Sequence, residues 1–117
     1  MKNVSARRYL PLCLSLCMTS VSQAGPVDLQ LLARSQIDIL PLALSEGDRQ
    51  WLSGKAALTL GTSAPDYPPF DISTGSDYFE GVTADYAGLL SHLLQVPIKV
   101  SRYETRGDVI SALKKGE

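Results

Sequence analysis

Hydrophobic residues in the second half of the chain recur with the period of an α-helix. Between Thr83 and Leu94 they occupy positions i, i+3, i+4, i+7 and i+8, which are Tyr86, Leu89, Leu90, Leu93 and Leu94. Residues at this spacing share one face of a helix, so the pattern predicts an amphipathic helix with these five side chains buried. Thr83 is a suitable N-terminal cap, and Pro97 prevents the helix from continuing.

Two short segments have the pattern of β-strands. Residues 56–61 form an apolar run bounded by turn residues, which is typical of a buried strand, and residues 98–103 alternate apolar and polar side chains. A second helix is predicted from near Thr105 to residues 114–116, and its inward-facing side chains are Val109, Ile110 and Leu113. The order strand, loop, helix, strand, helix predicts an α/β fold.

The N-terminal residues have the order of a secretory signal peptide. Arg7 and Arg8 precede an apolar run over residues 10–21, and Ser22-Gln23-Ala24 follows as a small-x-small cleavage pattern. We therefore expect residues 1–24 to be a signal peptide that is cleaved after Ala24. The alternative is a membrane-spanning helix, but Pro11 and the polar residues of the segment leave too short an apolar stretch.

Cysteine content and charge narrow the class of protein. Cys13 and Cys17 both lie in the apolar run, so the exported chain has no cysteine and depends on an ordinary hydrophobic core. The whole chain has 11 basic and 12 acidic residues, and loss of residues 1–24 leaves 8 basic against 12 acidic, a net charge of −4 with His92 neutral. This balance argues against nucleic acid as a partner.

Residues 25–54 are predicted to form a leader with a short helix. Its first part, residues 25–44, is apolar but irregular, so we expect it to pack on the following domain or to tether it. Ser45 with Asp48 resembles a capping box that begins a helical turn, and Ser53-Gly54 ends this turn. Trp51 is expected to anchor the helix to the domain.

The loop of residues 63–71, with the sequence Ser-Ala-Pro-Asp-Tyr-Pro-Pro-Phe-Asp, indicates a ligand site. Pro68 and Pro69 fix the backbone φ angle and donate no backbone hydrogen bond, so the segment is neither a helix interior nor a central strand. Because it follows a buried strand, it lies at the carboxyl end of the sheet, where open α/β folds bind small molecules. Tyr67 and Phe70 are candidate ligand contacts; the alternative is that they cover the edge of the core.

The sequence contains no recognisable catalytic constellation. His92 is the sole histidine and has no neighbouring partner for nucleophilic catalysis, so we expect it to be solvated or partly packed. Asp66, Asp71 and Asp77 surround the loop, but they lack the regular oxygen-donor spacing of a calcium site. We therefore expect no enzymatic activity, no metal and no cofactor.

Several segments together resemble a known family. The segments Leu60-Gly61, 63–71, 80–85 and 112–117 resemble the first lobe of periplasmic solute-binding proteins of family 3, which have the Venus-flytrap fold. Residues 49–52 and 84–86 are most similar to the sensor domains of unorthodox hybrid histidine kinases. The resemblance spans residues 48–117 and implies that residues 55–117 form a partial first lobe, truncated after the second helix.

This resemblance implies a binding function in the periplasm. In the family, two α/β lobes close around an amino acid or a similar small solute, and the aromatic side chain of the first loop packs against it. By position this aromatic residue is Tyr67, with Phe70 and Asp66 beside it, whereas Asp85 matches an acid for which we expect a structural role.

The second lobe would belong to a longer parent, anchored in the inner membrane, which signals through a membrane histidine kinase. The alternative is a fragment of a free periplasmic binding protein that serves an ABC transporter. Some flytrap relatives are fused to transglycosylases that degrade cell-wall polymers, but this sequence supplies no catalytic acid for such a reaction.

Overall fold

The computed structural model describes residues 24–40, 42–75 and 77–117. The predicted signal peptide, apart from Ala24, lies outside the described residues. No helix in the described ranges is long and apolar enough to cross a membrane.

Five strands form one sheet in the order β2-β5-β1-β4-β3. Their bounds are Val27–Leu31 for β1, Leu58–Ser63 for β2, Ile72–Thr74 for β3, Tyr78–Glu80 for β4 and Ile98–Tyr103 for β5. β5 has the predicted bounds, whereas β2 begins and ends two residues later than predicted. β2 and β5 pair in parallel, as do β1 and β4, but β1 runs antiparallel to β5, and β3 runs antiparallel to β4. The sheet is therefore mixed.

The middle strand of this sheet is β1, which the irregular apolar pattern of the leader did not predict. Within residues 27–31 apolar and polar side chains do alternate, and Leu29 is buried between the flanking strands. β1 pairs with β5 on one side and with β4 on the other. The leader is thus built into the sheet through this strand.

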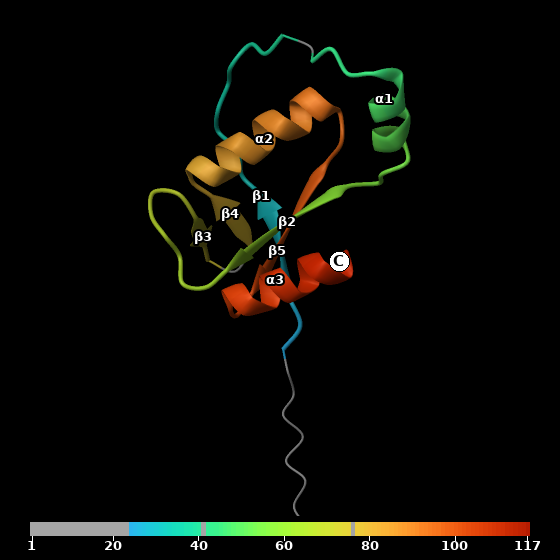
Figure 1. Cartoon of the computed structure of the whole chain (residues 1–117). Helices are drawn as coiled ribbons and strands as arrows, with labels where there is room; N and C mark the ends of the chain where they lie inside the picture. The colour runs from blue at the N-terminus through green and yellow to red at the C-terminus, as the bar shows by residue number, and fades with distance from the viewer. Residues whose placement is uncertain (1–23, 41, 76) are drawn as a thin grey trace, which may run out of the picture.

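Two helices cover opposite faces of the sheet (Figure 1). Helix α2, Val82–Leu94, packs on β4, β1 and β5, and helix α3, Arg106–Lys115, packs on β2 and β5. Neighbouring residues of a strand point to opposite faces, and β2 illustrates this arrangement. Leu60 joins the core under α2, whereas a Cβ atom on Gly61 would lie 2.8 Å from Val109 Cγ1 of α3.

The buried face of α2 consists of small residues, and the sequence prediction of its face was therefore wrong in part. Ala84 and Ala87 are buried, and a Cβ atom on Gly88 would lie 2.3 Å from the Cβ atom of Ala33 in the leader. These small side chains let the helix approach the sheet and the leader closely. Tyr86 and Leu90 therefore point to solvent, while Leu89, Leu93 and Leu94 are half-buried.

The prediction for α3 was wrong in a similar way. Ala112 is buried and Val109 is half-buried, but Ile110 and Leu113 are exposed. Gly61 gives Val109 room to approach β2, so the face that contacts the sheet passes through Val109 and Ala112. Ile110 and Leu113 lie beside this face.

The predicted N-terminal cap of α1, Glu46–Ser53, is confirmed, and the predicted cap of α2 is wrong. Ser45 caps α1, and Thr105 caps α3; each side chain accepts a hydrogen bond from a backbone N–H three residues later. In α2 the N-cap is Gly81 and not the predicted Thr83, because the backbone carbonyls of the 63–71 loop take the place of a capping side chain.

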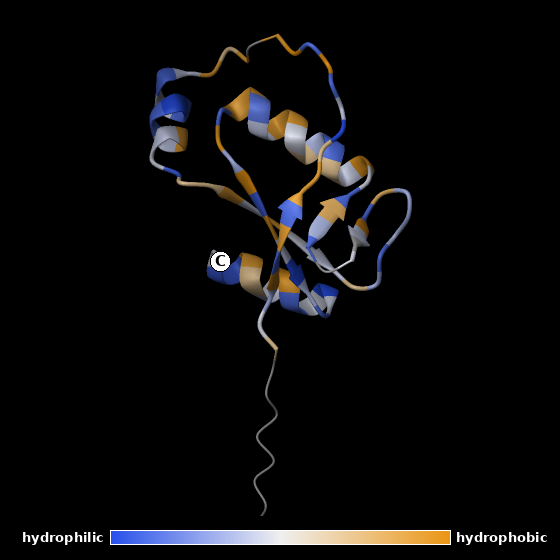
Figure 2. Ribbon diagram, turned by 180° about the vertical axis from the view of Figure 1, so that it is seen from behind, coloured by the Kyte–Doolittle hydropathy of each residue, from blue (hydrophilic) through white to orange (hydrophobic). Residues whose placement is uncertain are grey.

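Helix α1 is mainly hydrophilic (Figure 2). Leu52 is its buried residue, and Trp51 is exposed, so the predicted anchoring role of Trp51 was wrong. The indole ring of Trp51 lies 4.8 Å from Lys55 Nζ, an arrangement that keeps both side chains on the surface.

We predict that Gly81→Ala destabilises the fold strongly. Gly81 has a φ angle of +108°, and a Cβ atom there would lie 2.3 Å from the carbonyl oxygen of Phe70. Backbone strain and steric overlap together should lower the free energy of unfolding by about 3 kcal/mol or more. The control is Gly75→Ala, where φ is +73° but no atom lies within 4 Å, and where we expect a loss of about 1 kcal/mol. Equal losses in urea unfolding would contradict the steric explanation.

Candidate functional site

The candidate site is the 63–71 loop, which begins where β2 ends and leads into β3. β2 and β5 are parallel and end at the same edge of the sheet, where the N–H of Ala64 donates to the carbonyl of Tyr103. From this edge the loop projects beside the sheet and reaches the N-terminus of α2 (Figure 1). The loop therefore lies at the carboxyl edge that the sequence predicted.

Asp66 fixes the base of the loop. Its Oδ2 atom accepts a hydrogen bond of 2.9 Å from the N–H of Ser73, and its Oδ1 atom pairs with Arg102 Nη2 at 3.0 Å. Both charged side chains are about one-third exposed, at 33% and 30%, so solvent screens the pair in part. Asp66 thus joins the loop to β3 and to β5.

A tight turn presents the aromatic residues. Tyr67 and Asp71 exchange backbone hydrogen bonds of 2.8 and 3.1 Å, and the N–H of Phe70 donates to the carbonyl of Tyr67. The carbonyls of Pro69 and Phe70 accept hydrogen bonds from Val82 and Thr83 in the first turn of α2. The turn is therefore closed on itself and attached to the helix.

The two aromatic side chains of this turn point largely to solvent. Tyr67 is 70% exposed and Phe70 is 50% exposed. The alternative reading, in which both side chains cover the edge of the core, does not describe this arrangement. An exposed aromatic ring on a closed, anchored turn can stack on a ligand with little loss of backbone freedom.

The three acids around the loop do not converge. Asp66 is occupied by Arg102 and Ser73, and a carboxylate oxygen of Asp71 is buried without a hydrogen-bond partner within the described residues. No group of three or more His, Cys, Asp or Glu side chains in the described ranges could hold a metal ion. His92 is exposed on α2, far along the helix from the loop.

Asp85 has a structural role, as the sequence suggested. Its Oδ1 atom accepts hydrogen bonds from the backbone N–H groups of Arg34 and Ser35, at 2.6 and 3.2 Å. The guanidinium group of Arg34 also pairs with Glu80 at the end of β4. These contacts hold the leader against the start of α2 just after it leaves β1.

A pocket in the described residues lies elsewhere. It has a volume of about 660 Å³ and lies between the leader, α1 and the C-terminal end of α2. Neither Tyr67, Phe70 nor Asp66 lines it. The exposed aromatic side chains of the 63–71 loop therefore lie outside this pocket.

Comparison with known proteins gives relatives for most of this chain. The chain matches no protein-family model. It is 43% identical over 90 residues to the virulence sensor protein BvgS of Bordetella pertussis, and 42% identical to BvgS of Bordetella bronchiseptica. The match covers 77% of this chain and 7% of either relative.

The crystal structure of the B. pertussis BvgS periplasmic domain matches the same share of the chain. The TM-score is 0.72 at 42% sequence identity, and the match covers 77% of this chain and 17% of that structure. The chain is homologous to part of the BvgS periplasmic domain. This homology confirms the predicted periplasmic location and the resemblance to a sensor domain.

We predict that Asp66 contributes to stability by two separable interactions. Asp66→Ala removes the acceptor of Ser73 and the partner of Arg102, and it should lower the free energy of unfolding by about 2 kcal/mol. Asp66→Asn retains an acceptor and should cost about 1 kcal/mol, because it removes mainly the charge of a pair that is one-third exposed.

Urea unfolding measures both changes. Asp38→Ala is the matched control, since Asp38 is exposed in the leader, and it should change stability by less than about 0.5 kcal/mol. If Asp66→Ala is as stable as Asp38→Ala, Asp66 does not anchor the loop.

Proposed function

We propose that this chain is part of a periplasmic sensor domain that binds an amino acid or a similar small solute. The observation that carries the proposal is the homology to the periplasmic domain of the virulence sensor protein BvgS, at 42% identity and a TM-score of 0.72. The chain spans 7% of the length of the curated relatives, and in this proposal the rest of the sensor belongs to a longer parent.

In this proposal residues 55–117, together with strand β1 of the leader, form part of the first lobe of a Venus-flytrap domain of solute-binding family 3. The second lobe, supplied by the parent, would close over the carboxyl edge of β2 and β5. The position of the 63–71 loop at this edge supports the closure of a second lobe there, since a ligand held at the loop would contact both lobes.

Tyr67 and Phe70 are the proposed ligand contacts on this lobe, and their exposure on an anchored turn supports this assignment. Asp66 belongs to the proposed site mainly as a positioning residue, because Ser73 and Arg102 occupy both of its carboxylate oxygens. We propose that this segment binds its solute without catalysing a reaction and without a cofactor.

Signalling would follow from the two-lobed design. A solute that contacts both lobes favours the closed over the open arrangement, and the shift in this equilibrium would be passed to a histidine kinase in the inner membrane. Transport by a free binding protein is the second candidate, but the homology to a sensor protein does not favour it.

We predict that Tyr67→Ala weakens solute binding by about 1 to 3 kcal/mol, because it removes an exposed stacking surface. The experiment uses the complete parent domain, titrated by calorimetry with each standard amino acid in turn. Tyr86→Ala is the matched control, since Tyr86 is 65% exposed, close to the 70% of Tyr67, but lies on α2.

The expected outcome is binding of at least one amino acid by the wild type and by Tyr86→Ala, with weaker binding by Tyr67→Ala. Equal affinities of the two variants would remove Tyr67 from the site. If no amino acid binds the wild type, the proposed solute class is wrong.

A further inference from the structure

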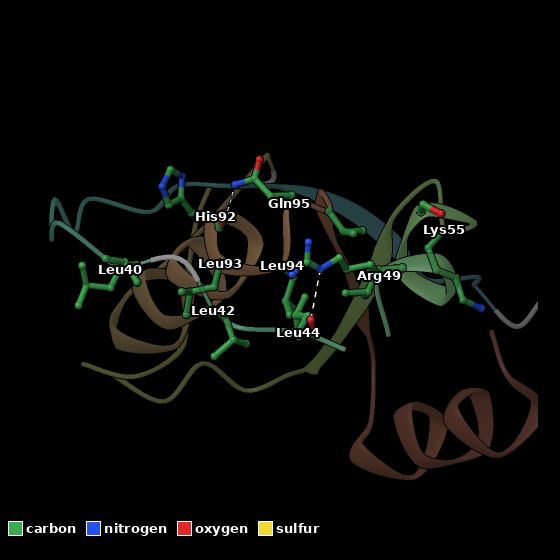
Figure 3. Close-up of a pocket in the computed structure, with 13 residues that line it drawn as sticks. Leu40, Leu42, Leu44, Arg49, Lys55, His92, Leu93, Leu94 and Gln95 are labelled. Atoms are coloured by element: carbon green, nitrogen blue, oxygen red, sulfur yellow. Dashed lines mark hydrogen bonds between the residues drawn. The ribbon is translucent and has the colours of Figure 1, made fainter. Parts of the chain in front are cut away.

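The pocket between the leader, α1 and the end of α2 is lined by apolar side chains from three separate segments (Figure 3). The leader, α1 and the end of α2 border an open pocket of about 660 Å³, a volume within the usual range of small-molecule sites. The apolar lining residues are Ile39, Leu40, Leu42, Leu44, Leu52, Leu93, Leu94 and Val96. This lining suits the hydrocarbon part of a ligand.

The polar residues around the pocket include two cationic groups but no acid. Arg49 and Lys55 line it, together with His92, Ser53 and Gln95, whereas no Asp or Glu does. Arg49 and Lys55 come from α1 and the residues just after it, and His92 comes from α2. The pocket therefore combines an apolar interior with a positively charged rim.

Arg49 is the cation best placed to hold an anionic group. Its Nε atom donates to the carbonyl of Leu44 at 3.2 Å, which fixes the guanidinium group between α1 and the leader (Figure 3). The two terminal nitrogen atoms form no hydrogen bond or ion pair within the described part of the chain. Lys55, by contrast, lies over the ring of Trp51.

Two leader residues of the pocket carry much exposed apolar surface. Leu40 is 87% exposed and Leu42 is 52% exposed, although both line the concave side. A hydrocarbon chain laid between the leader and α2 would remove part of this surface from water, which is favourable in proportion to the area covered.

We propose that this pocket binds a single-chain amphipathic carboxylate, a ligand of the fatty-acid class. The acyl chain would lie between the leader leucines and the end of α2, and the carboxylate would pair with Arg49. A concave pocket of this volume encloses one chain, whereas binding to a lipid bilayer would need an apolar surface that projects from the protein.

This site is separate from the 63–71 loop. The loop contacts the first turn of α2 and the pocket contacts its last turn, which places them roughly 20 Å apart along the helix axis. Failure of amino acid binding at Tyr67 and failure of this proposal are therefore distinguishable.

Calorimetric titration of the full chain with sodium decanoate, below its micelle-forming concentration, tests the proposal. We expect saturable binding of one decanoate per chain. Octanoate should bind about tenfold more weakly than decanoate. It has two fewer methylene groups, and burial of each one contributes about 0.8 kcal/mol to the binding free energy. Decyltrimethylammonium, which has the same chain with the opposite charge, should bind more weakly still.

Two variants and their controls locate the site. Arg49→Gln should weaken decanoate binding at least tenfold, and Arg106→Gln on α3 should leave it unchanged. Leu42→Asp, which places an anion in the pocket, should have a similar effect, and the control Leu113→Asp should have none. Leu42 and Leu113 are both exposed, so neither substitution disturbs the core.

Several outcomes would overturn the proposal. These are absence of saturable binding, equal affinity for octanoate and decanoate, unchanged affinity in Arg49→Gln, and sedimentation with phosphatidylglycerol vesicles without decanoate binding. Tyr67→Ala should leave decanoate affinity unchanged, and a loss there would place the ligand at the loop instead.

Discussion

The pairing of β1 on both of its edges is the interaction on which the rest of the structure depends. Without β1 the sheet would separate into the β2–β5 pair and the β3–β4 hairpin, and isolated two-stranded units are marginally stable in water. Leu29 of β1 also lies in the core with Phe79, Ala84 and Val100, which belong to β4, α2 and β5. One strand therefore unites the backbone hydrogen bonding and the hydrophobic core.

The candidate site depends on this framework through a few polar contacts. β4 and β3 position the end of the loop, and β5 supplies Arg102, which holds Asp66 at its start. The loop in turn satisfies backbone N–H groups of α2 that a capping side chain would otherwise satisfy. Loop and helix thus stabilise one another, and the exposed position of Tyr67 follows from both attachments.

The sequence predicted the elements with strong local signals. The alternation in residues 98–103, the capping box of Ser45 and the helical period after Thr83 are contained in short windows, and the structure confirms them. The sequence did not predict β1, because the position of this strand depends on strands about 50 and 70 residues away in sequence. The partnership of Asp66 with Arg102, 36 residues apart, and the small-residue face of α2 also depend on tertiary packing. Periodicity locates a helix better than it identifies the side chains that contact the sheet.

The leader gives α2 a different environment at each end. Near its start, Asp85 holds the backbone of Arg34 and Ser35, and Gly88 lets Ala33 approach, so the leader is fixed there by hydrogen bonds and close packing. Near the end of α2 the leader is separated from the helix by the 660 Å³ pocket, which it borders before α1 begins. A ligand in that pocket would join the leader to the end of α2 by contacts that the protein alone does not make.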